Sequence, residues 1–294
     1  MAPPSTPSID NPIRTVAVLG AGTMGHGIAQ VAAATGHSTC LFDIKAEFVE
    51  RGLSRVKANL DKGVDRGKVT AEQRETTLAG LRGESDLAAA VAGADIVIEA
   101  VPEKLELKQE LFGKVAPHVS EDTILATNTS SLSVEKIAAP LPNPGRVIGT
   151  HFFNPVHIMK LLEIIVADTT SEAALARTKA FGATLGKETI TIKDFPGFAT
   201  SRLGLVIGLE AIRMVEQGVG SAEDIDKAMT LGYGFPMGPL KLTDLVGLDV
   251  RLHIADYLSR ALPMGAHFEP PALLRQMVDE GKLGKKSGQG FYTW

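Results

Sequence analysis

Cysteine is almost absent from this chain of 294 residues, because Cys40 is its only one. A single thiol excludes an intrachain disulfide and any cysteine-rich metal site, and it predicts a reducing, cytoplasmic location. Cys40 lies within an apolar segment, so we expect it to fill the core. No cluster of His, Cys and Asp residues has the spacing of metal ligands, and the sequence therefore predicts no bound metal.

Long apolar runs and a strong excess of one charge are lacking as well. No run approaches the roughly twenty apolar residues of a membrane span, so we expect no membrane partner. The net charge of −4 argues against a general nucleic-acid surface, and any basic site for an anionic ligand must be local. Residues 1–13 contain four prolines but neither the basic nor the hydrophobic zone of a signal peptide, which predicts a flexible leader.

A glycine-rich loop is the first motif that is present. An apolar, β-branched run over residues 15–19 precedes it, and a helix of small residues follows it. In this context the loop matches the GxGxxG pattern. Its first glycine permits a tight turn, its second lets the backbone approach a pyrophosphate, and its third allows close packing of helix and strand. The cofactor loop is therefore assigned to Gly20, Gly22, Thr23, Met24 and Gly25.

An acidic residue ends the next apolar strand, over residues 39–42. This residue, Asp43, comes about twenty residues after the first glycine, where an acid accepts hydrogen bonds from the adenosine ribose. A carboxylate there also repels a 2′-phosphate. The sequence therefore predicts NAD as the cofactor, while Lys45 nearby leaves NADP open.

Strand and helix patterns alternate up to about residue 193. This alternation predicts an α/β fold with a mostly parallel, doubly wound sheet, which is a Rossmann-type NAD-binding domain over residues 14–193. The expected strands cover residues 15–19, 39–42, 95–100, 123–127, 146–150, 161–166 and 189–192. The expected helices include a charged pair over 45–63 and 70–81 and single helices over 104–115 and 172–185.

The strand signal ends at the turn formed by residues 194–197, after which long helical patterns follow. We expect an all-α C-terminal domain over residues 194–294, with helices over 198–217 and 221–231 and another that begins at Pro239. The apolar faces of these helices are too long for a single layer. They predict a homodimer.

A histidine and a buried acid form the candidate catalytic pair. Glu163 lies in the apolar run 161–166, where an unpaired carboxylate is strongly unfavourable. His151 is the simplest partner, because a carboxylate bound to one ring nitrogen fixes the tautomer and leaves the other nitrogen for acid–base catalysis. A salt-bridged core acid beside a hydrogen-bonded turn histidine explains the pattern equally well, so both interpretations stay open.

Several motifs, taken together, match one enzyme family. They lie at residues 20–25, 99–103, 128–131, 151–155, 196–198, 235–239 and 288–292. From about Ile13 to Trp294 the chain resembles the monofunctional L-3-hydroxyacyl-CoA dehydrogenases, of the 3-hydroxybutyryl-CoA dehydrogenase type. The resemblance implies NAD-dependent oxidation of L-3-hydroxyacyl-CoA to 3-oxoacyl-CoA, and the reverse, in fatty-acid β-oxidation.

The resemblance also implies roles for individual residues. His151 takes the proton of the substrate's 3-hydroxyl, Glu163 holds the imidazole, and Ser130 hydrogen-bonds the substrate oxygen beside the cofactor. Ser201 stands where the family has an asparagine that contacts substrate, and its hydroxyl can still donate. The other implied contacts are Glu103, Lys108, Asn154 and Lys286 to the cofactor, and Ser54 and Lys62 to CoA, with Lys62 next to Asp61, which aligns with the family's lysine.

Two other functions stay open. The same scaffold carries dehydrogenases of free hydroxy acids or sugar acids, such as the gulonate dehydrogenases, and Ser201 and the displaced lysine keep that interpretation. A catalytically silent NAD-binding protein is the third interpretation. The intact set of Ser130, His151 and Glu163 argues against it.

Overall fold

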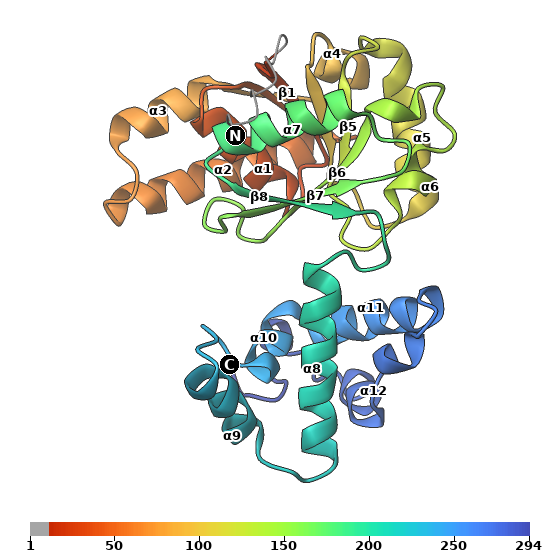
Figure 1. Ribbon diagram of the computed structural model, residues 1–294. Coiled ribbons are helices and arrows are strands. Elements are labelled where there is room, and N and C mark those ends of the chain that lie inside the picture. Colours follow the sequence, from red (N-terminus) through yellow and green to blue (C-terminus); the bar gives the residue numbers. More distant parts are fainter. Residues whose placement is uncertain (1–11) are drawn as a thin grey trace, which may run out of the picture. The chain divides into compact units, whose positions relative to one another are not determined.

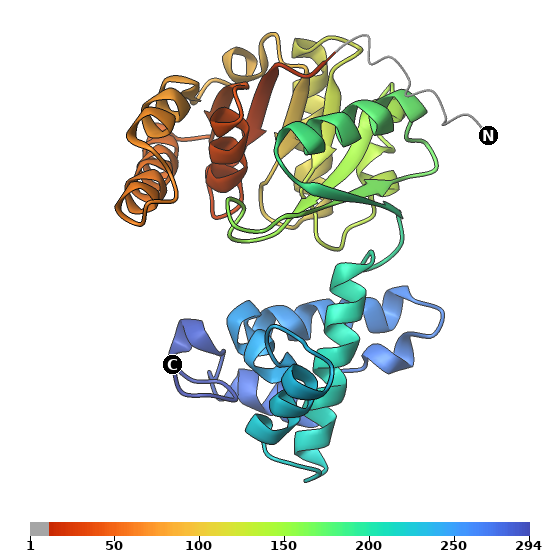
Figure 2. The same ribbon diagram turned by 60° about the vertical axis from the view of Figure 1, so that its left-hand side comes forward.

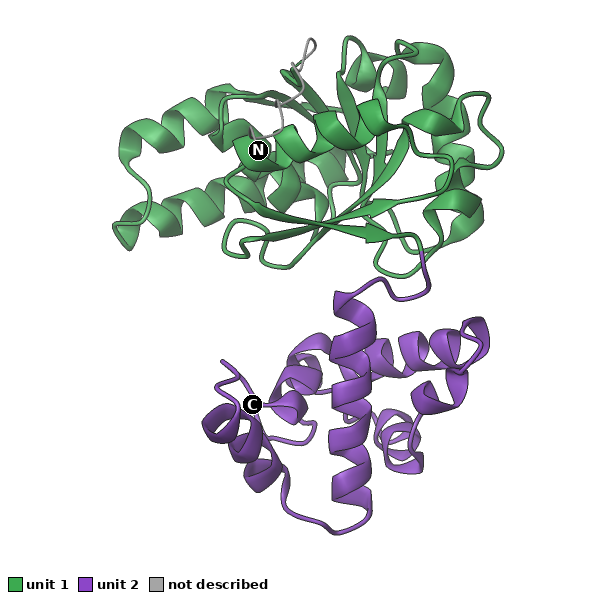
Figure 3. Cartoon of the chain, in the orientation of Figure 1, with its two compact units in different colours: residues 1–194 green, residues 195–294 purple. Residues whose placement is uncertain are grey.

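The computed structural model describes residues 12–294, which form two compact units (Figure 3). Unit 1 ends at Asp194 and unit 2 runs over Phe195–Trp294. Residues 1–11 of the expected leader lie outside the described residues, whereas Ile13 is only 8% exposed and belongs to the apolar core of unit 1. Within residues 12–294, no helix is long and apolar enough to cross a membrane.

An eight-stranded sheet in the order β3-β2-β1-β4-β5-β6-β7-β8 forms the centre of unit 1 (Figure 1). Every neighbouring pair of strands is parallel except β6 and β7, which are antiparallel. The doubly wound, mostly parallel sheet predicted from the sequence is therefore confirmed. The strands are β1 (Thr15–Leu19), β2 (Ser38–Phe42), β3 (Leu81–Glu84), β4 (Ile96–Glu99), β5 (Ile124–Thr127), β6 (Val147–Phe152), β7 (Leu161–Val166) and β8 (Glu188–Lys193).

Helices cover both faces of this sheet (Figure 2). On one face lie α7 and α1, which packs against the hairpin of α2 and α3, and on the other α5 packs against both α4 and α6. The helices are α1 (Gly25–Ala34), α2 (Ala46–Asp65), α3 (Ala71–Ala79), α4 (Leu87–Val91), α5 (Leu105–Val115), α6 (Val134–Ala138) and α7 (Glu172–Thr184). Strands between two helical layers are buried on both faces, so any polar side chain on them needs an internal partner.

Strand β3 was not predicted. We expected a helix to continue to Leu81, but α3 ends at Ala79 and the chain then pairs in parallel with β2, with Leu81 opposite Thr39. The segment Leu-Arg-Gly-Glu has one large apolar residue and no β-branched one. Its strand conformation therefore comes from pairing with β2 and not from its own pattern.

Unit 2 is entirely helical around one apolar core. Its longest helix, α8 (Thr200–Glu216), buries Leu205, Leu209 and Ile212 at helical spacing, and helices α9 to α12 complete the core. Ser221 caps α9 by accepting a hydrogen bond from the Asp224 amide, and Pro239 is the first residue of α10, where the sequence predicted that a helix begins. The remaining helices are α9 (Ala222–Lys227), α10 (Pro239–Val246), α11 (Leu248–Ala261) and α12 (Ala272–Asp279).

Candidate active site

The candidate catalytic pair lies on the two antiparallel strands of unit 1. His151 and Glu163 are directly opposite each other in the β6–β7 register, and Nδ1 of His151 lies 2.8 Å from Oε2 of Glu163. The Glu163 side chain is fully buried and that of His151 is 9% exposed. The hydrogen bond to the carboxylate places the proton of the neutral imidazole on Nδ1, which makes Nε2 the basic nitrogen. This geometry permits acid–base chemistry at Nε2.

The glycine loop lies at the point where the strand order reverses, between β1 and β4, which is where such sheets bind dinucleotides. A Cβ on Gly25 would lie 1.7 Å from the carbonyl oxygen of Gly20, so only glycine allows this turn. Gly22 is different, because a Cβ there would meet no protein atom within 4 Å and the residue is exposed. An open backbone at Gly22 fits the close approach of a diphosphate, and the loop therefore fits NAD.

Asp43 lies beside this loop at the end of β2. Its Oδ2 accepts a hydrogen bond of 2.8 Å from the Ala21 amide, and its Oδ1 accepts one of 2.8 Å from the Ile44 amide. The carboxylate thus fixes the loop as well as standing where the ribose acceptor was predicted. Each oxygen has a further lone pair with which it can accept from a ribose hydroxyl.

Buried charged side chains form a network at the ends of the next strands, β4 and β5. The sequence did not indicate a role for its central residue, Glu99. Glu99, at the end of β4, is fully buried and lies 2.8 Å and 2.9 Å from Nζ of Lys108, whose side chain is 1% exposed. The Val101 amide and the Thr127 hydroxyl donate to the same carboxylate, each at 2.7 Å. Lys108, a predicted cofactor contact, is an interior counter-ion of Glu99 in this structure.

The second acid of this network holds the loop that carries Ser130. Oε2 of Glu103 lies 3.2 Å from Nζ of Lys108. Oε1 of Glu103 accepts hydrogen bonds from the Thr129 hydroxyl at 2.6 Å, the Ser130 amide at 2.8 Å and the Ser131 amide at 3.1 Å. Glu103 therefore positions Ser130, a role that the sequence did not indicate.

Burial and pairing shift the two carboxylates of the network in opposite directions. Burial raises the pKa of Glu99 above its usual value, against the opposing effects of Lys108, Thr127 and Val101. Burial also acts on Glu103, but the charge of Lys108 and the hydrogen bonds from Thr129 and Ser130 outweigh it and lower its pKa. Glu103 is thus held as a carboxylate that accepts from the loop.

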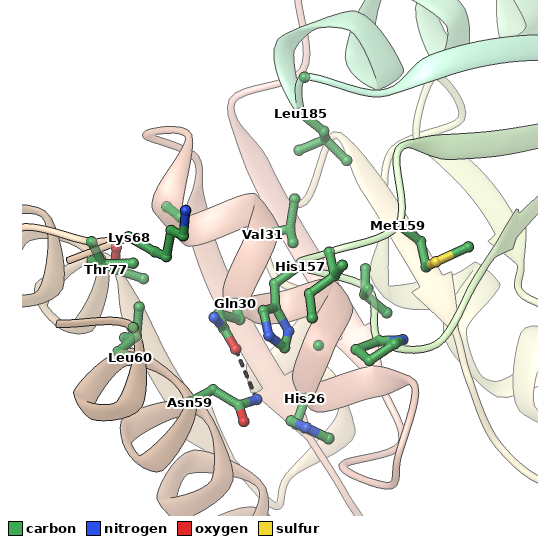
Figure 4. A pocket seen from close by; sticks show the side chains of 18 of the residues that line it. His26, Gln30, Val31, Asn59, Leu60, Lys68, Thr77, His157, Met159 and Leu185 are labelled. Atoms are coloured by element: carbon green, nitrogen blue, oxygen red, sulfur yellow. Dashed lines mark hydrogen bonds between the residues drawn. The ribbon is translucent and has the colours of Figure 1, made fainter. Parts of the chain in front are cut away.

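A cavity of about 1040 Å³ opens in unit 1 beside α1, the α2–α3 hairpin and the loop that follows β6 (Figure 4). Among the described residues, no Asp or Glu lines it. Burial is the main cause that lowers the pKa of His157 in its wall, and the neighbouring His26 and Lys187 lower it further. Its basic or imidazole side chains are His26, Lys62, Arg66, Lys68, His157, Lys160 and Lys187.

The walls of this cavity are fixed by polar contacts. Nζ of Lys187 donates to the carbonyl oxygens of Val156 and Met159 at 2.5 Å and 2.7 Å, and Nδ2 of Asn59 donates to Oε1 of Gln30 at 3.1 Å (Figure 4). Thus the cavity begins where the chain leaves the strand of His151. It fits an anionic ligand of cofactor size.

Other residues singled out in the sequence fall in several places. Thr23 and Asn154 line the cavity with Lys62, whereas Ser54 is exposed on α2 and is not part of the lining. Two residues belong to unit 2. Ser201 lies in the first turn of α8, and Nζ of Lys286 lies 2.5 Å from Oδ1 of Asp249. The described residues contain no group of three or more His, Cys, Asp or Glu that could hold a metal ion.

The comparisons with known proteins point to the same family in both units of the chain. Residues 15–195 match the model of the 3-hydroxyacyl-CoA dehydrogenase NAD-binding domain, and residues 197–294 match that of the 3-hydroxyacyl-CoA dehydrogenase C-terminal domain. A 3-hydroxybutyryl-CoA dehydrogenase of Mycobacterium tuberculosis is 43% identical over 96% of this chain and 99% of its own length. The crystal structure of M. tuberculosis FadB2 superposes with a TM-score of 0.92 at 43% identity, covering 97% of this chain and all of that one.

One similar protein is longer than this chain. The 3-hydroxyadipyl-CoA dehydrogenase of Escherichia coli is 43% identical over 96% of this chain, and the match spans 59% of the length of the E. coli enzyme.

Replacing Lys108 with Met should destabilise the protein in a pH-dependent way. The variant leaves Glu99 buried without its counter-ion, so the free energy of unfolding at pH 7.5 should fall by about 3–5 kcal/mol. Because the pKa of Glu99 in the folded state is already raised and rises further without Lys108, protonation at lower pH should relieve much of this loss. Urea denaturation at pH 7.5 and 5.5 measures the difference.

Lys114→Met is the matched control for this variant. Lys114 is on the same helix, α5, but its side chain is 63% exposed, so its loss should change stability little at either pH. A destabilisation of Lys108→Met that is equal at both pH values would contradict the buried-charge explanation.

Proposed function

Because this chain belongs to the 3-hydroxyacyl-CoA dehydrogenase family, we propose that it oxidises L-3-hydroxyacyl-CoA thioesters with NAD and catalyses the reverse reduction. The observation that carries the proposal is the pairing of His151 with the buried Glu163 at 2.8 Å. This pair is a general base with a fixed tautomer at the end of a strand, at the same edge of the sheet as the dinucleotide loop.

The path of the proton follows from the geometry of this pair. In the oxidation, Nε2 of His151 accepts the proton of the substrate's 3-hydroxyl, and the imidazolium that results is stabilised by the carboxylate of Glu163. NAD, when bound, supplies the acceptor for the hydride that leaves C3. In the reduction, His151 returns the proton from Nε2 to the ketone oxygen, so the same two residues serve both directions.

Ser130 supplies a second polar group at this centre. Its hydroxyl hydrogen-bonds the substrate oxygen, where charge develops as the proton leaves. Glu103 holds the Ser130 amide at 2.8 Å, and Lys108 fixes Glu103, so the hydroxyl is positioned before substrate binds. In this proposal Glu103 and Lys108 act on the reaction by positioning Ser130. The substrate contact of Ser201 rests on the resemblance to the family alone.

The cavity beside α1 is the proposed binding site for the CoA portion of the substrate. CoA carries three phosphate groups, and the positive lining with Lys62, Arg66 and Lys68 offers them counter-ions without a competing carboxylate. Lys62 therefore stays in the proposal. Ser54 does not line the cavity, and its predicted contact with CoA stays a prediction.

The proposal also covers the oligomeric state and the cellular location of the protein. Unit 2 exposes Leu203, Leu231 and Tyr233 by 62%, 84% and 79%, and we infer that a second copy of the chain covers such residues in a homodimer. A sedimentation coefficient of a single chain would contradict this inference. A cytoplasmic location rests on the single, buried Cys40.

The substrate class is tested by comparing acetoacetyl-CoA with free acetoacetate in the oxidation of NADH. We expect efficient turnover of the thioester only, and Lys62→Met should raise its KM about tenfold, the effect of one charged contact. Lys57→Met is the control, because Lys57 is exposed on the same helix and does not line the cavity. Comparable turnover of free acetoacetate would indicate a dehydrogenase of free hydroxy acids instead.

Replacing His151 with Gln removes the acid–base group and keeps a polar side chain. We expect kcat to fall by about two to four powers of ten, because general acid–base catalysis is lost, while the Kd for NADH stays nearly constant. Stopped-flow turnover and NADH fluorescence titration measure the two quantities. His118→Gln, at an exposed position, is the control, and near-normal turnover of His151→Gln would remove His151 from the mechanism.

Replacing Asp43 with Asn keeps an acceptor for the Ala21 amide but removes the negative charge. The preference for NAD over NADP should fall about tenfold or more, since a charged hydrogen bond to the ribose and the repulsion of a 2′-phosphate are both lost. The ratio of kcat/KM for the two cofactors measures it. Glu47→Gln removes a nearby exposed charge and should leave the ratio unchanged, and an unchanged ratio in Asp43→Asn would refute the ribose assignment.

A further inference from the structure

Strand β6 extends beyond its parallel neighbour β5, and His151 lies in the part that extends. The parallel pairing of the two strands ends where Thr127 lies opposite Gly149, while β6 continues to Phe152. On its other side β6 stays paired with β7 up to Phe152. The end of β6 that carries His151 therefore has a neighbouring strand on one side only.

The side chain of Asn128 takes over the pairing at this point. Asn128 is the first residue after β5, and its Oδ1 accepts a hydrogen bond of 2.9 Å from the Phe152 amide. Its own amide donates to the carbonyl oxygen of Glu99, at the end of β4, at 2.8 Å. Because a backbone amide can only donate, the oxygen of the Asn128 carboxamide makes the contact with β6, and its Nδ2 cannot replace it.

Asn128 also begins the loop that carries Ser130. The next residue, Thr129, is fully buried, and its hydroxyl donates to Oε1 of Glu103 at 2.6 Å. The Ser130 amide donates to the same oxygen at 2.8 Å. The main chain of Asn128 thus continues into the loop that Glu103 fixes, while its side chain holds the strand end of His151.

Other contacts set the orientation of the imidazole but not its distance from the Ser130 loop. Nδ1 of His151 lies 2.8 Å from Oε2 of Glu163, and the ring of Phe153 packs against the imidazole with the ring centroids 4.5 Å apart. Glu163 belongs to β7 and Phe153 follows β6, so neither residue connects His151 to the chain that follows β5. The contact of Asn128 does.

The Phe152 side chain and the Phe152 amide restrain the strand end in different directions. The side chain is 2% exposed and belongs to the apolar core. Side chains stand roughly perpendicular to a sheet, whereas the hydrogen bonds between strands lie within it. Core packing therefore fixes the strand end across the sheet, and the hydrogen bond to Asn128 fixes it sideways against the Ser130 loop.

We propose that Asn128 is a positioning residue, whose Oδ1 sets the distance between His151 and the hydroxyl of Ser130. This inference rests on the proposed function, in which both groups reach the same oxygen of the substrate. Groups that act on one reacting atom must be held to within about 0.5 Å of the productive geometry. Asn128 needs no contact with the substrate for this role.

Two substitutions of similar size separate the oxygen of Asn128 from the rest of the side chain. Asn128→Leu removes the acceptor, and we expect it to slow the reduction of acetoacetyl-CoA by NADH about 10- to 100-fold, the effect of a displacement of up to about 1 Å. Asn128→Asp keeps an acceptor for the Phe152 amide. It should stay within a factor of about three of the wild type, because a carboxylate near His151 favours the imidazolium that donates the proton in this direction.

The rate constant is measured in single turnovers with the enzyme in excess over NADH. Inactive molecules then do not contribute to the observed rate constant, so a loss of folded enzyme alone leaves it unchanged. A positioning role slows the single turnover, while the Kd for NADH in a fluorescence titration stays within a factor of about two. Asn128→Ala removes the same acceptor and replaces Asn128→Leu if that variant does not fold.

Asn143→Leu is the matched control. Asn143 lies before the other end of β6, it is partly exposed as Asn128 is, and its Nδ2 donates one hydrogen bond of 3.3 Å to Oε2 of Glu121. The loss of this hydrogen bond should leave the single-turnover rate unchanged, because it does not bear on the strand end that carries His151.

The outcomes distinguish the proposed function from the role of Asn128. If the wild type does not oxidise NADH with acetoacetyl-CoA, the proposed function fails. If it does, a normal single-turnover rate of the acceptor-free variant refutes the positioning role. A rate of Asn128→Asp as low as that of the acceptor-free variant refutes it as well, since Nδ2 and not Oδ1 would then be the atom that the reaction requires.

Discussion

The need to give buried carboxylates a partner inside the sheet is the constraint on which the site of unit 1 depends. Strands between two helical layers offer no water, so Glu163 on β7 and Glu99 on β4 require partners from the protein. Glu163 obtains a histidine from the neighbouring strand, and Glu99 obtains Lys108 from α5. The pairing of Glu163 with His151 produces a group that can exchange a proton. The pairing of Glu99 with Lys108 produces a fixed ion pair that anchors the loop of Ser130.

The His151–Glu163 pair and the Glu99–Lys108 pair belong to one site because the parallel strands end at the same edge of the sheet. The glycine loop follows β1, Asp43 follows β2, Glu99 ends β4, and the Ser130 loop follows β5. The structure holds these segments to one another through backbone hydrogen bonds to side chains, such as the Ala21 amide to Asp43 and the Ser130 amide to Glu103. The edge is therefore preorganised, which is what electrostatic catalysis requires of groups that must not reorient during the reaction.

The sequence was sufficient for those parts of the site whose physical requirement is local. The glycine loop, the acid after β2 and the unfavourable carboxylate of Glu163 could each be recognised from neighbouring residues. Glu99 follows the apolar residues Ile-Val-Ile, so the same reasoning would have indicated that Glu99 has a buried counter-ion. Lys108 could not be assigned as that counter-ion, because α5 carries several charges and its buried side is set by tertiary packing. Strand β3 was out of reach for the same reason, since its pairing with β2 is a property of the folded chain.

The two buried carboxylates of the sheet have partners of different kinds. Glu163 is hydrogen-bonded by an imidazole, a group that can gain a proton, whereas Glu99 is paired with a lysine ammonium that serves as a fixed counter-ion. Glu103 contacts the same lysine and holds the loop of Ser130 through the Ser130 amide. A change at Lys108 would therefore act on this loop through Glu103, while the hydrogen bond between His151 and Glu163 does not pass through Lys108.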